Sequence, residues 1–151
     1  MAEITEIVLQ EDSHEKLREK FPGMNCFRIK RGEETVGRCV GFVCTDRQRL
    51  HNWIDEYRDF EVSPDVQGLP LPVGVLQDIT VFERFRRMDY ATLAVVQFLN
   101  WCVDDGCSHV ILNAASDTVS TPDLVRLYEK SGFKLLCDSG LGKFMVWTKT
   151  E

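Results

Sequence analysis

Hydrophobic and polar residues follow two periods along this chain, and each period predicts its own kind of element. Apolar residues at every second position, or in short unbroken runs between turn residues, predict strands. This strand pattern occurs at residues 5–9, 26–30, 36–43, 73–81, 110–112, 133–136 and 144–148. The polar turn at 31–34 joins two of these segments as a β-hairpin.

Apolar residues at helical spacing predict the helices between those strands. Asp12 followed by Glu15 has the spacing of a capping box, so a helix is expected that begins there and ends before Pro22. The other helical segments are the first half of 46–72, residues 91–103 and residues 121–132. Strand–helix–strand connections in the second half predict parallel neighbours, and the hairpins predict a mixed sheet. We expect a single α/β domain over 1–151, with a central mixed β-sheet flanked by helices.

Charge and composition exclude some classes of function. The chain has 151 residues and a net charge of −6, which argues against a domain that binds nucleic-acid phosphates and is compatible with a cationic substrate. No apolar run is long enough to span a membrane, and the acidic N-terminus does not resemble a signal peptide, so a cytoplasmic protein is expected. The six cysteines form no Cys-x-x-Cys pair and the three histidines are scattered, so we expect reduced thiols and no metal.

Two segments of the second half together resemble the GNAT superfamily of N-acetyltransferases. The sequence at 127–133 is Leu-Tyr-Glu-Lys-Ser-Gly-Phe, which is similar to the family's Tyr-x-x-x-Gly-Phe signature at the end of its penultimate helix. The strand, loop and helix over 76–103 occupy the place of its acetyl-CoA motif. The resemblance covers 73–148 and extends to the N-terminal half by element order. It implies the acyl-CoA N-acyltransferase fold and transfer of acetyl from acetyl-CoA to a primary amine, a small molecule or a protein lysine or N-terminus, by direct attack in a ternary complex.

The resemblance also implies where acetyl-CoA would lie. In the family, pantetheine pairs with the backbone of the strand that here ends in Ile79, Thr80 and Val81. The pyrophosphate sits on the next loop and helix N-terminus, usually Arg/Gln-x-x-Gly-x-Gly/Ala, because exposed helix N–H groups attract phosphate. The six positions here are Arg86, Arg87, Met88, Asp89, Tyr90 and Ala91. Thr121 stands where the family often has an Asn that contacts the cofactor, although an N-cap role explains Thr121 equally well.

Asp89 departs from that pattern, because it replaces the first glycine of the loop. As an N-cap it would accept the N–H bonds that a phosphate should receive, and its charge would oppose the pyrophosphate. The arginines at 84, 86 and 87 can instead bind phosphate oxygens through their side chains. A catalytically inactive GNAT-like binding or regulatory module is therefore the alternative to an acetyltransferase.

Tyr128 is the candidate general acid that would protonate the departing CoA thiolate, as the family's tyrosine does at this place. The alternative is a tyrosine that only completes the apolar stripe of its helix. Asp78 is the candidate base, because Gln77 replaces the Glu that some polyamine-type members carry and cannot take a proton. Asp78 hydrogen-bonded to the backbone or facing solvent, Glu83 as base, and a water chain remain alternatives. A backbone N–H within 79–81 would hold the oxyanion.

The acceptor and the assembly are less defined by sequence. Residues 46–72 would lie beside the acceptor pocket, and their acids suit a cationic amine together with Trp53 and Tyr57; these acids are Asp55, Glu56, Asp59, Glu61 and Asp65. A solvated helix face is the alternative. A wider cleft near Thr80 would favour another acyl-CoA. Apolar residues of the last strands, Phe144, Val146 and Trp147, are either the edge of a homodimer or core.

Overall fold

The strands form one mixed sheet of seven, in the order β1-β2-β3-β4-β5-β7-β6. The structure is a computed structural model that describes residues 7–12, 19, 23–55, 68–86, 89–114, 121–138 and 143–149, without the side chains of 55, 121, 137 and 138. The strands are β1 (Val8–Glu11), β2 (Asn25–Arg31), β3 (Glu34–Cys44), β4 (Val73–Val81), β5 (His109–Ala114), β6 (Lys134–Asp138) and β7 (Lys143–Thr148). Each predicted strand is present, and the predicted α/β fold with a mixed sheet is confirmed.

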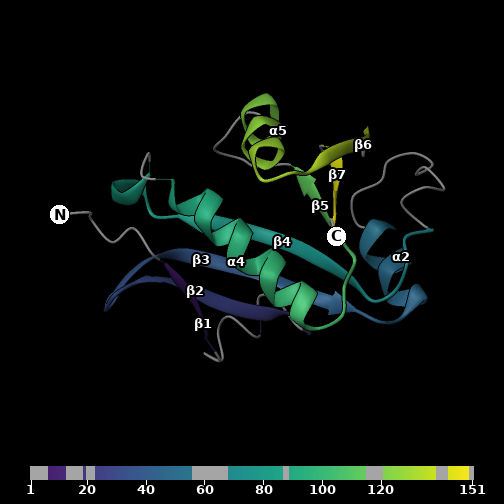
Figure 1. The fold of residues 1–151 in the computed structure, drawn as a ribbon, viewed down its shortest axis with the longest axis horizontal. Coiled ribbons are helices and arrows are strands. Elements are labelled where there is room, and N and C mark those ends of the chain that lie inside the picture. The colour runs from purple at the N-terminus through teal and green to yellow at the C-terminus, as the bar shows by residue number, and fades with distance from the viewer. Residues whose placement is uncertain are drawn as a thin grey trace.

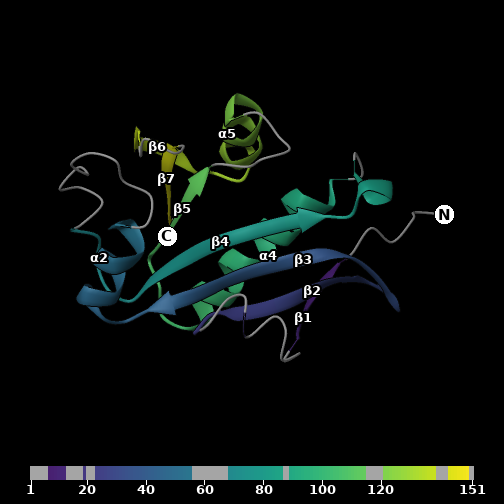
Figure 2. The same cartoon turned by 180° about the vertical axis from the view of Figure 1, so that it is seen from behind.

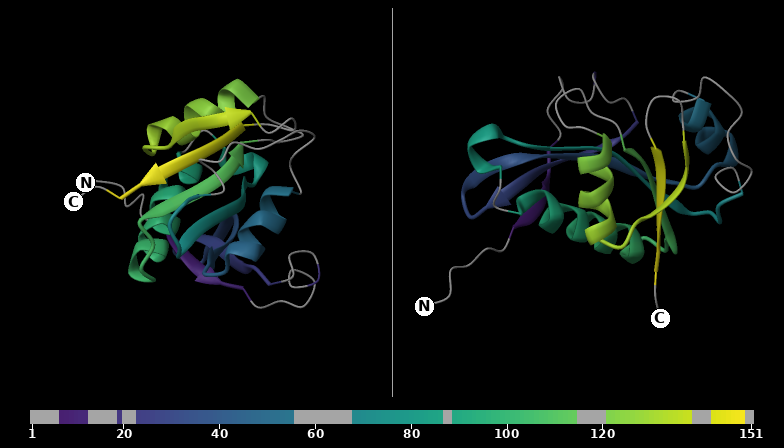
Figure 3. Two further views of the ribbon diagram at one scale, coloured as in Figure 1. Left: turned by 90° about the vertical axis from the view of Figure 1, so that its right-hand side faces the viewer. Right: turned by 90° about the horizontal axis from the view of Figure 1, so that it is seen from above.

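Helices cover both faces of this sheet. The described helices are α2 (Arg47–Asp55), the short 3-10 turn η1 (Glu83–Phe85), α4 (Tyr90–Asp104) and α5 (Thr121–Lys130). Figures 1, 2 and 3 show α4 and α5 on one face and α2 on the other. None of the described helices is long and apolar enough to cross a membrane. The helix expected between 12 and 22 falls outside the described residues apart from 12 and 19. The side chains of the acidic residues at 55–65 are also outside the described part.

Two hydrophobic clusters hold the layers together, one on each face of the sheet. Phe98 of α4 is fully buried in the first cluster, and Trp53 of α2 is buried in the second. Two glycines let α4 lie close to the sheet: a Cβ at Gly41 would meet the Phe98 ring at 2.4 Å, and one at Gly74 would meet Cys102 Sγ at 2.5 Å. Side chains at these positions would force the helix off the sheet.

The apolar residues of β7 belong to this core and not to an exposed edge. Phe144 has no exposed surface and packs in the cluster on the α2 face, while Val146 and Trp147 are partly buried. In addition, β7 is paired on both sides, with β5 and with β6. Phe144 is therefore core, and Val146 and Trp147 pack against the core as partly buried residues.

The parallel strands β4 and β5 pair over only part of their length. Their register runs from Val73–His109 to Leu76–Leu112, where the pairing ends. Beyond that point β4 continues to Val81 and stays paired with β3 on its other side. The edge of β4 that faces β5 therefore presents backbone groups without a strand partner from residue 77 onward. This opening between the two strands positions the candidate site.

A β-bulge in β4 lies at the start of the opening. Val40 of β3 pairs with Asp78, but the next residue, Gly41, pairs with Leu76, so Gln77 is the extra residue. Side chains normally alternate between the faces of a sheet, and one extra residue lets two successive side chains share a face. Gln77 accepts a hydrogen bond from Trp53 of α2. Asp78 pairs with Val40, whose neighbour Gly41 faces α4, so Val40 and Asp78 face the opposite side of the sheet. Both polar residues therefore face the α2 side.

Candidate active site

A cleft fills the opening between β4 and β5. Its walls are β4 and α5, with one residue from β5 and two from the loop and start of α4; the lining residues are Leu76, Gln77, Asp78, Ile79, Thr80, Val81, Arg86, Ala91, Asn113, Asp123, Leu124, Leu127 and Tyr128. The structure thus brings together the predicted acid, the predicted base and the predicted cofactor strand. These residues come from segments that lie far apart in the sequence, and the incomplete pairing of β4 with β5 is what makes room for a ligand among them.

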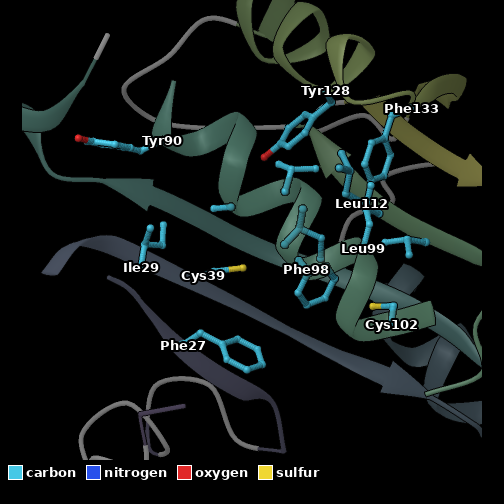
Figure 4. Close-up of a cluster of buried hydrophobic side chains, with 14 of the residues drawn as sticks. Phe27, Ile29, Cys39, Tyr90, Phe98, Leu99, Cys102, Leu112, Tyr128 and Phe133 are labelled. Carbon is cyan, nitrogen blue, oxygen red and sulfur yellow. The ribbon is translucent and has the colours of Figure 1, made fainter. Parts of the chain in front are cut away.

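Tyr128 enters the cleft from α5 and is only 7% exposed. Gly132 adopts φ 97°, a left-handed conformation that ends the helix at low cost, and the chain then turns so that Phe133 N donates to Tyr128 O at 3.1 Å. The Phe133 ring consequently packs edge-on against Tyr128, with centroids 5.8 Å apart. Figure 4 shows the phenol pointing from α5 toward α4 and β4. The Tyr-x-x-x-Gly-Phe motif therefore has a structural role: it fixes the tyrosine ring.

The electrostatic surroundings of Tyr128 keep its phenol protonated. Burial is the main cause that raises the pKa of Tyr128 above its ordinary value, and the negative charge of Asp78 raises it further. A phenol held neutral at neutral pH is a hydrogen-bond donor and a proton source. The effect of Asp78 also shows that the carboxylate and the phenol share one electrostatic environment across the cleft.

Asp78 and Gln77 form the opposite wall at the β4 bulge. Thr80 Oγ1 donates to Asp78 Oδ2 at 2.9 Å, and Trp53 Nε1 donates to Gln77 Oε1 at 2.7 Å. The Asp78 side chain thus lines the cleft, and it accepts a hydrogen bond from the hydroxyl of Thr80. Glu83, the alternative base, lines a separate shallow hollow with Phe82 and Arg84.

Asp89 sits at the N-cap of α4 but does not cap it. Its backbone has φ 59° and ψ 18°, and its side chain makes no capping hydrogen bond, so the expectation that it would occupy the helix N–H groups was wrong. The physical reason is the left-handed backbone, because a capping side chain reaches the helix N–H groups from an extended backbone. The first N–H groups of α4 have no partner within the helix, and the Asp89 side chain does not occupy them, so they suit an anion.

The left-handed backbone also explains how an aspartate can replace the glycine of the family pattern. Asp89 is the one non-glycine residue of the described chain with positive φ. Glycine adopts this conformation freely, and aspartate is among the few other residues that adopt it routinely. At position 89 the aspartate therefore takes a backbone conformation that glycine also adopts, and it adds a negative charge.

The side chains around the start of α4 divide between the core and the cleft. Tyr90 is buried, packs against Phe85 and accepts a hydrogen bond from Arg31, so only its backbone N–H can face a ligand. Ala91 and Arg86 line both the cleft and a neighbouring hollow that Asp89 also borders. The Arg86 side chain is anchored by Nε, which donates to Val81 O at 3.1 Å.

The side chains of the remaining predicted cofactor residues are not among those that the structure describes. Arg87 and Met88 lie outside the described residues, and Thr121 is described only as the first residue of α5. Among the described cations near the loop, Arg31 is paired with Glu34 at 2.7 Å, and Arg84 lies over the Phe85 ring. Arg86 is therefore the described arginine that is best placed to meet a phosphate in the cleft.

Sequence reasoning missed several residues that line the cleft. Asn113 of β5 and Asp123 of α5 are polar, and Leu124 and Leu127 of α5 form its apolar side. Asp123 is paired with Arg126. A signal for Asn113 was present, since it is a polar residue in the otherwise apolar run Val-Ile-Leu-Asn-Ala at 110–114. Its position beside the opening is not visible without the strand register.

Comparison with solved structures shows where this fold occurs elsewhere. The acetyltransferase of Bacillus subtilis in complex with CoA is 9% identical, with a TM-score of 0.63 over 96% of this chain and 100% of that one. A GNAT family acetyltransferase from Elizabethkingia anophelis with acetyl-CoA bound is 11% identical, with a TM-score of 0.56 over 99% and 92%. The PaiA N-acetyltransferase from Thermoplasma acidophilum in complex with coenzyme A is 8% identical, with a TM-score of 0.58 over 87% of this chain and 65% of that one.

Sequence comparison gives the family directly. A search of curated proteins found no match. A family model described as the acetyltransferase (GNAT) family matches residues 2–133, which include β4, α4 and the Tyr-x-x-x-Gly-Phe motif that shape the cleft. The chain belongs to the acetyltransferase (GNAT) family of enzymes, as its sequence motifs and its mixed sheet predicted.

Proposed function

We propose that this protein transfers an acetyl group from acetyl-CoA to a primary amine by direct attack in a ternary complex. The observation that carries the proposal is the buried, protonated phenol of Tyr128, which lines one cleft with the carboxylate of Asp78 and the unpaired edge of β4. The family membership and the solved relatives with CoA or acetyl-CoA support the choice of cofactor.

The proposed cofactor site uses mainly backbone groups. Ile79, Thr80 and Val81 lie on the edge of β4 that β5 leaves unpaired, where the amides of pantetheine can add hydrogen bonds as a further strand would. The uncapped N-terminus of α4 suits the pyrophosphate, with Arg86 beside it. Arg87, Met88, Asp89, Tyr90 and Ala91 complete this loop in sequence, and Thr121 begins the facing helix.

The proposed reaction needs one proton acceptor and one proton donor. Asp78, directly or through water, takes the proton that an ammonium group must lose before its nitrogen attacks the thioester carbon. Backbone N–H groups of β4 stabilise the oxyanion that forms. After the attack the nitrogen carries one proton more than an amide. As the carbon–sulfur bond breaks, Tyr128 donates its proton to the thiolate, the nitrogen's surplus proton returns to the phenolate through water, and Asp78 releases its proton to solvent. The Asp78 carboxylate also favours an acceptor that arrives as a cation.

The proposal is tested by mixing the purified protein with acetyl-CoA and a panel of amines and lysine peptides. Mass spectrometry should show an acetylated amine, and a thiol reagent should show one CoA released per amide formed. The same assay with Tyr128→Phe reports whether the turnover belongs to this cleft. CoA binding without any acetylated product would instead support the inactive binding module.

A further inference from the structure

The side-chain amide of Asn113 is buried in the wall of the cleft, and none of the described residues bonds to it. Both its Nδ2 and its Oδ1 are inaccessible to solvent, and no described residue lies within hydrogen-bond distance of either. Buried polar atoms without partners are rare, because they lose their bonds to water and gain none in return. Since Asn113 also lines the cleft, a molecule bound there is the natural source of the missing hydrogen bonds.

The strand register places Asn113 on the side of the sheet that faces α2. Asn113 pairs with Phe144 of β7, and Phe144 packs in the cluster on the α2 face. Ile111, two residues before Asn113 on β5, belongs to the same cluster. The last β4–β5 pair is Leu76–Leu112, so Gln77 and Asn113 are the first residues beyond it, one on each strand. Two amide side chains thus border the opening on the same face.

Each of these two amides has an aromatic neighbour, Trp53 beside Gln77 and Phe144 opposite Asn113. Trp53 fixes Gln77 through the bond from Nε1 to Oε1 of 2.7 Å, and its ring lies 5.8 Å from the ring of Phe144. Tyr128 and its apolar neighbours belong to the opposite cluster, on the face of α4 and α5. Asn113 is therefore on the other side of the opening from the proposed acid.

We propose that Asn113, next to Gln77, is the hydrogen-bonding subsite for the amine acceptor, and that this acceptor carries a neutral amide close to its amine. The inference rests on the proposed function and names its substrate class. An asparagine amide both donates and accepts, so its complement is a group that does the same. A carboxamide or peptide group satisfies both atoms.

Two other acceptor chemistries leave one atom of Asn113 unsatisfied. The ammonium groups of a simple polyamine only donate, so they would leave Nδ2 without an acceptor. A carboxylate only accepts, and it would also meet the negative charge of Asp78 in the same cleft. An acceptor with an amine for Asp78 and an amide for Asn113 avoids both costs.

The test compares two acceptors of equal size at saturating acetyl-CoA and equal free-base concentration. 3-Aminopropanamide carries the amide, and 3-methylbutylamine is its hydrocarbon isostere. We expect wild-type kcat/KM to favour the aminoamide by about tenfold or more, because a site built for hydrogen bonds rejects a ligand that cannot make them. Equal kcat/KM values for the two amines would overturn the inference while leaving the acetyltransferase function in place.

The matched variants are Asn113→Leu and Asn100→Leu. Leucine at 113 keeps the size and removes the unpartnered amide, so the variant should fold at least as stably as wild type and lose the preference. Asn100 lies on the exposed side of α4, outside the cleft, and the same substitution there should keep the preference. If Asn113→Leu instead weakens acetyl-CoA binding and keeps the preference, the residue serves the cofactor and the inference is wrong.

A measurement that needs neither turnover nor a variant separates the two proposals. If wild type acetylates no amine, the proposed function fails. The subsite can then still be tested by recording the NMR signals of the side-chain amides of the protein in the presence of CoA. A shift of the Asn113 signal on titration with 3-aminopropanamide, absent with 3-methylbutylamine, supports the subsite. A signal that stays unchanged with both amines contradicts it.

Discussion

The two ends of the cleft are built in different ways. At the β4–β5 opening the proposed catalytic and binding groups are side chains held in place by their neighbours, such as the buried Tyr128 against Phe133 and the partly buried Gln77 against Trp53. At the start of α4 the working groups are backbone N–H groups, and the surrounding side chains of Arg86 and Asp89 are exposed. The first end depends on which residues are present, and the second depends on the conformation that the chain adopts.

The two ends also differ in how they match the family pattern. The opening carries the Tyr-x-x-x-Gly-Phe motif, whose helix end and turn place the phenol. The loop before α4 lacks the family's first glycine, yet Asp89 takes a left-handed backbone in its place. A cofactor held by N–H groups requires the backbone shape rather than the residue that produces it.

The largest effect should come from Tyr128→Phe at the opening. The variant keeps the ring that packs against Phe133 and removes only the proton donor, so kcat should fall by about 10²-fold or more. The Kd for acetyl-CoA, measured by calorimetry on the same variant, should stay within about twofold. A variant with wild-type kcat would remove the proposed role of the phenol.

Asp78→Asn should have the next largest effect, because it removes the charge but keeps the size of the side chain. We expect kcat/KM to fall by about tenfold to a hundredfold at neutral pH. The pKa of Tyr128 should also move down toward its ordinary value, because the charge of Asp78 is one cause that raises it. Ultraviolet titration of the phenols reports that shift, and an unchanged titration would show that the two groups are not coupled.

Three substitutions at Asp89 separate backbone shape from charge at the other end. Asp89→Gly and Asp89→Asn both remove the charge and suit a left-handed backbone, so acetyl-CoA should bind about threefold to tenfold more tightly. Asp89→Ala also removes the charge but disfavours that backbone, so it should bind less tightly than the other two. If alanine and glycine give the same Kd, the conformation of the loop does not matter and the comparison of the two ends fails.

The smallest effect concerns stability at alkaline pH. Because the pKa of Tyr128 is raised in the folded protein, the stability linked to the neutral phenol is complete below the ordinary tyrosine pKa of about 10 and is lost as pH rises through the folded value. The Tm of wild type should therefore fall more than that of Tyr128→Phe when the pH is raised from 9 to about 11. Parallel Tm profiles for the two proteins would contradict the assignment.

The sequence predicted the elements well, because their apolar patterns are periodic and long. It also located Tyr128, since a local motif sets both the helix end and the ring. It could not reveal the bulge at Gln77 or the burial of Asn113, because both follow from the register between strands that are distant in sequence. The backbone of Asp89 was missed for another reason: aspartate usually begins a helix by capping it, and the loop here imposes a different conformation.

The most direct test of the central claim is a calorimetric titration of the wild-type protein with acetyl-CoA. The claim is that the β4–β5 opening and the uncapped start of α4 together form a working acetyl-CoA site. The account predicts a single site with micromolar Kd. A folded protein that shows no binding up to millimolar acetyl-CoA would contradict it, and the cleft would then have to serve another ligand.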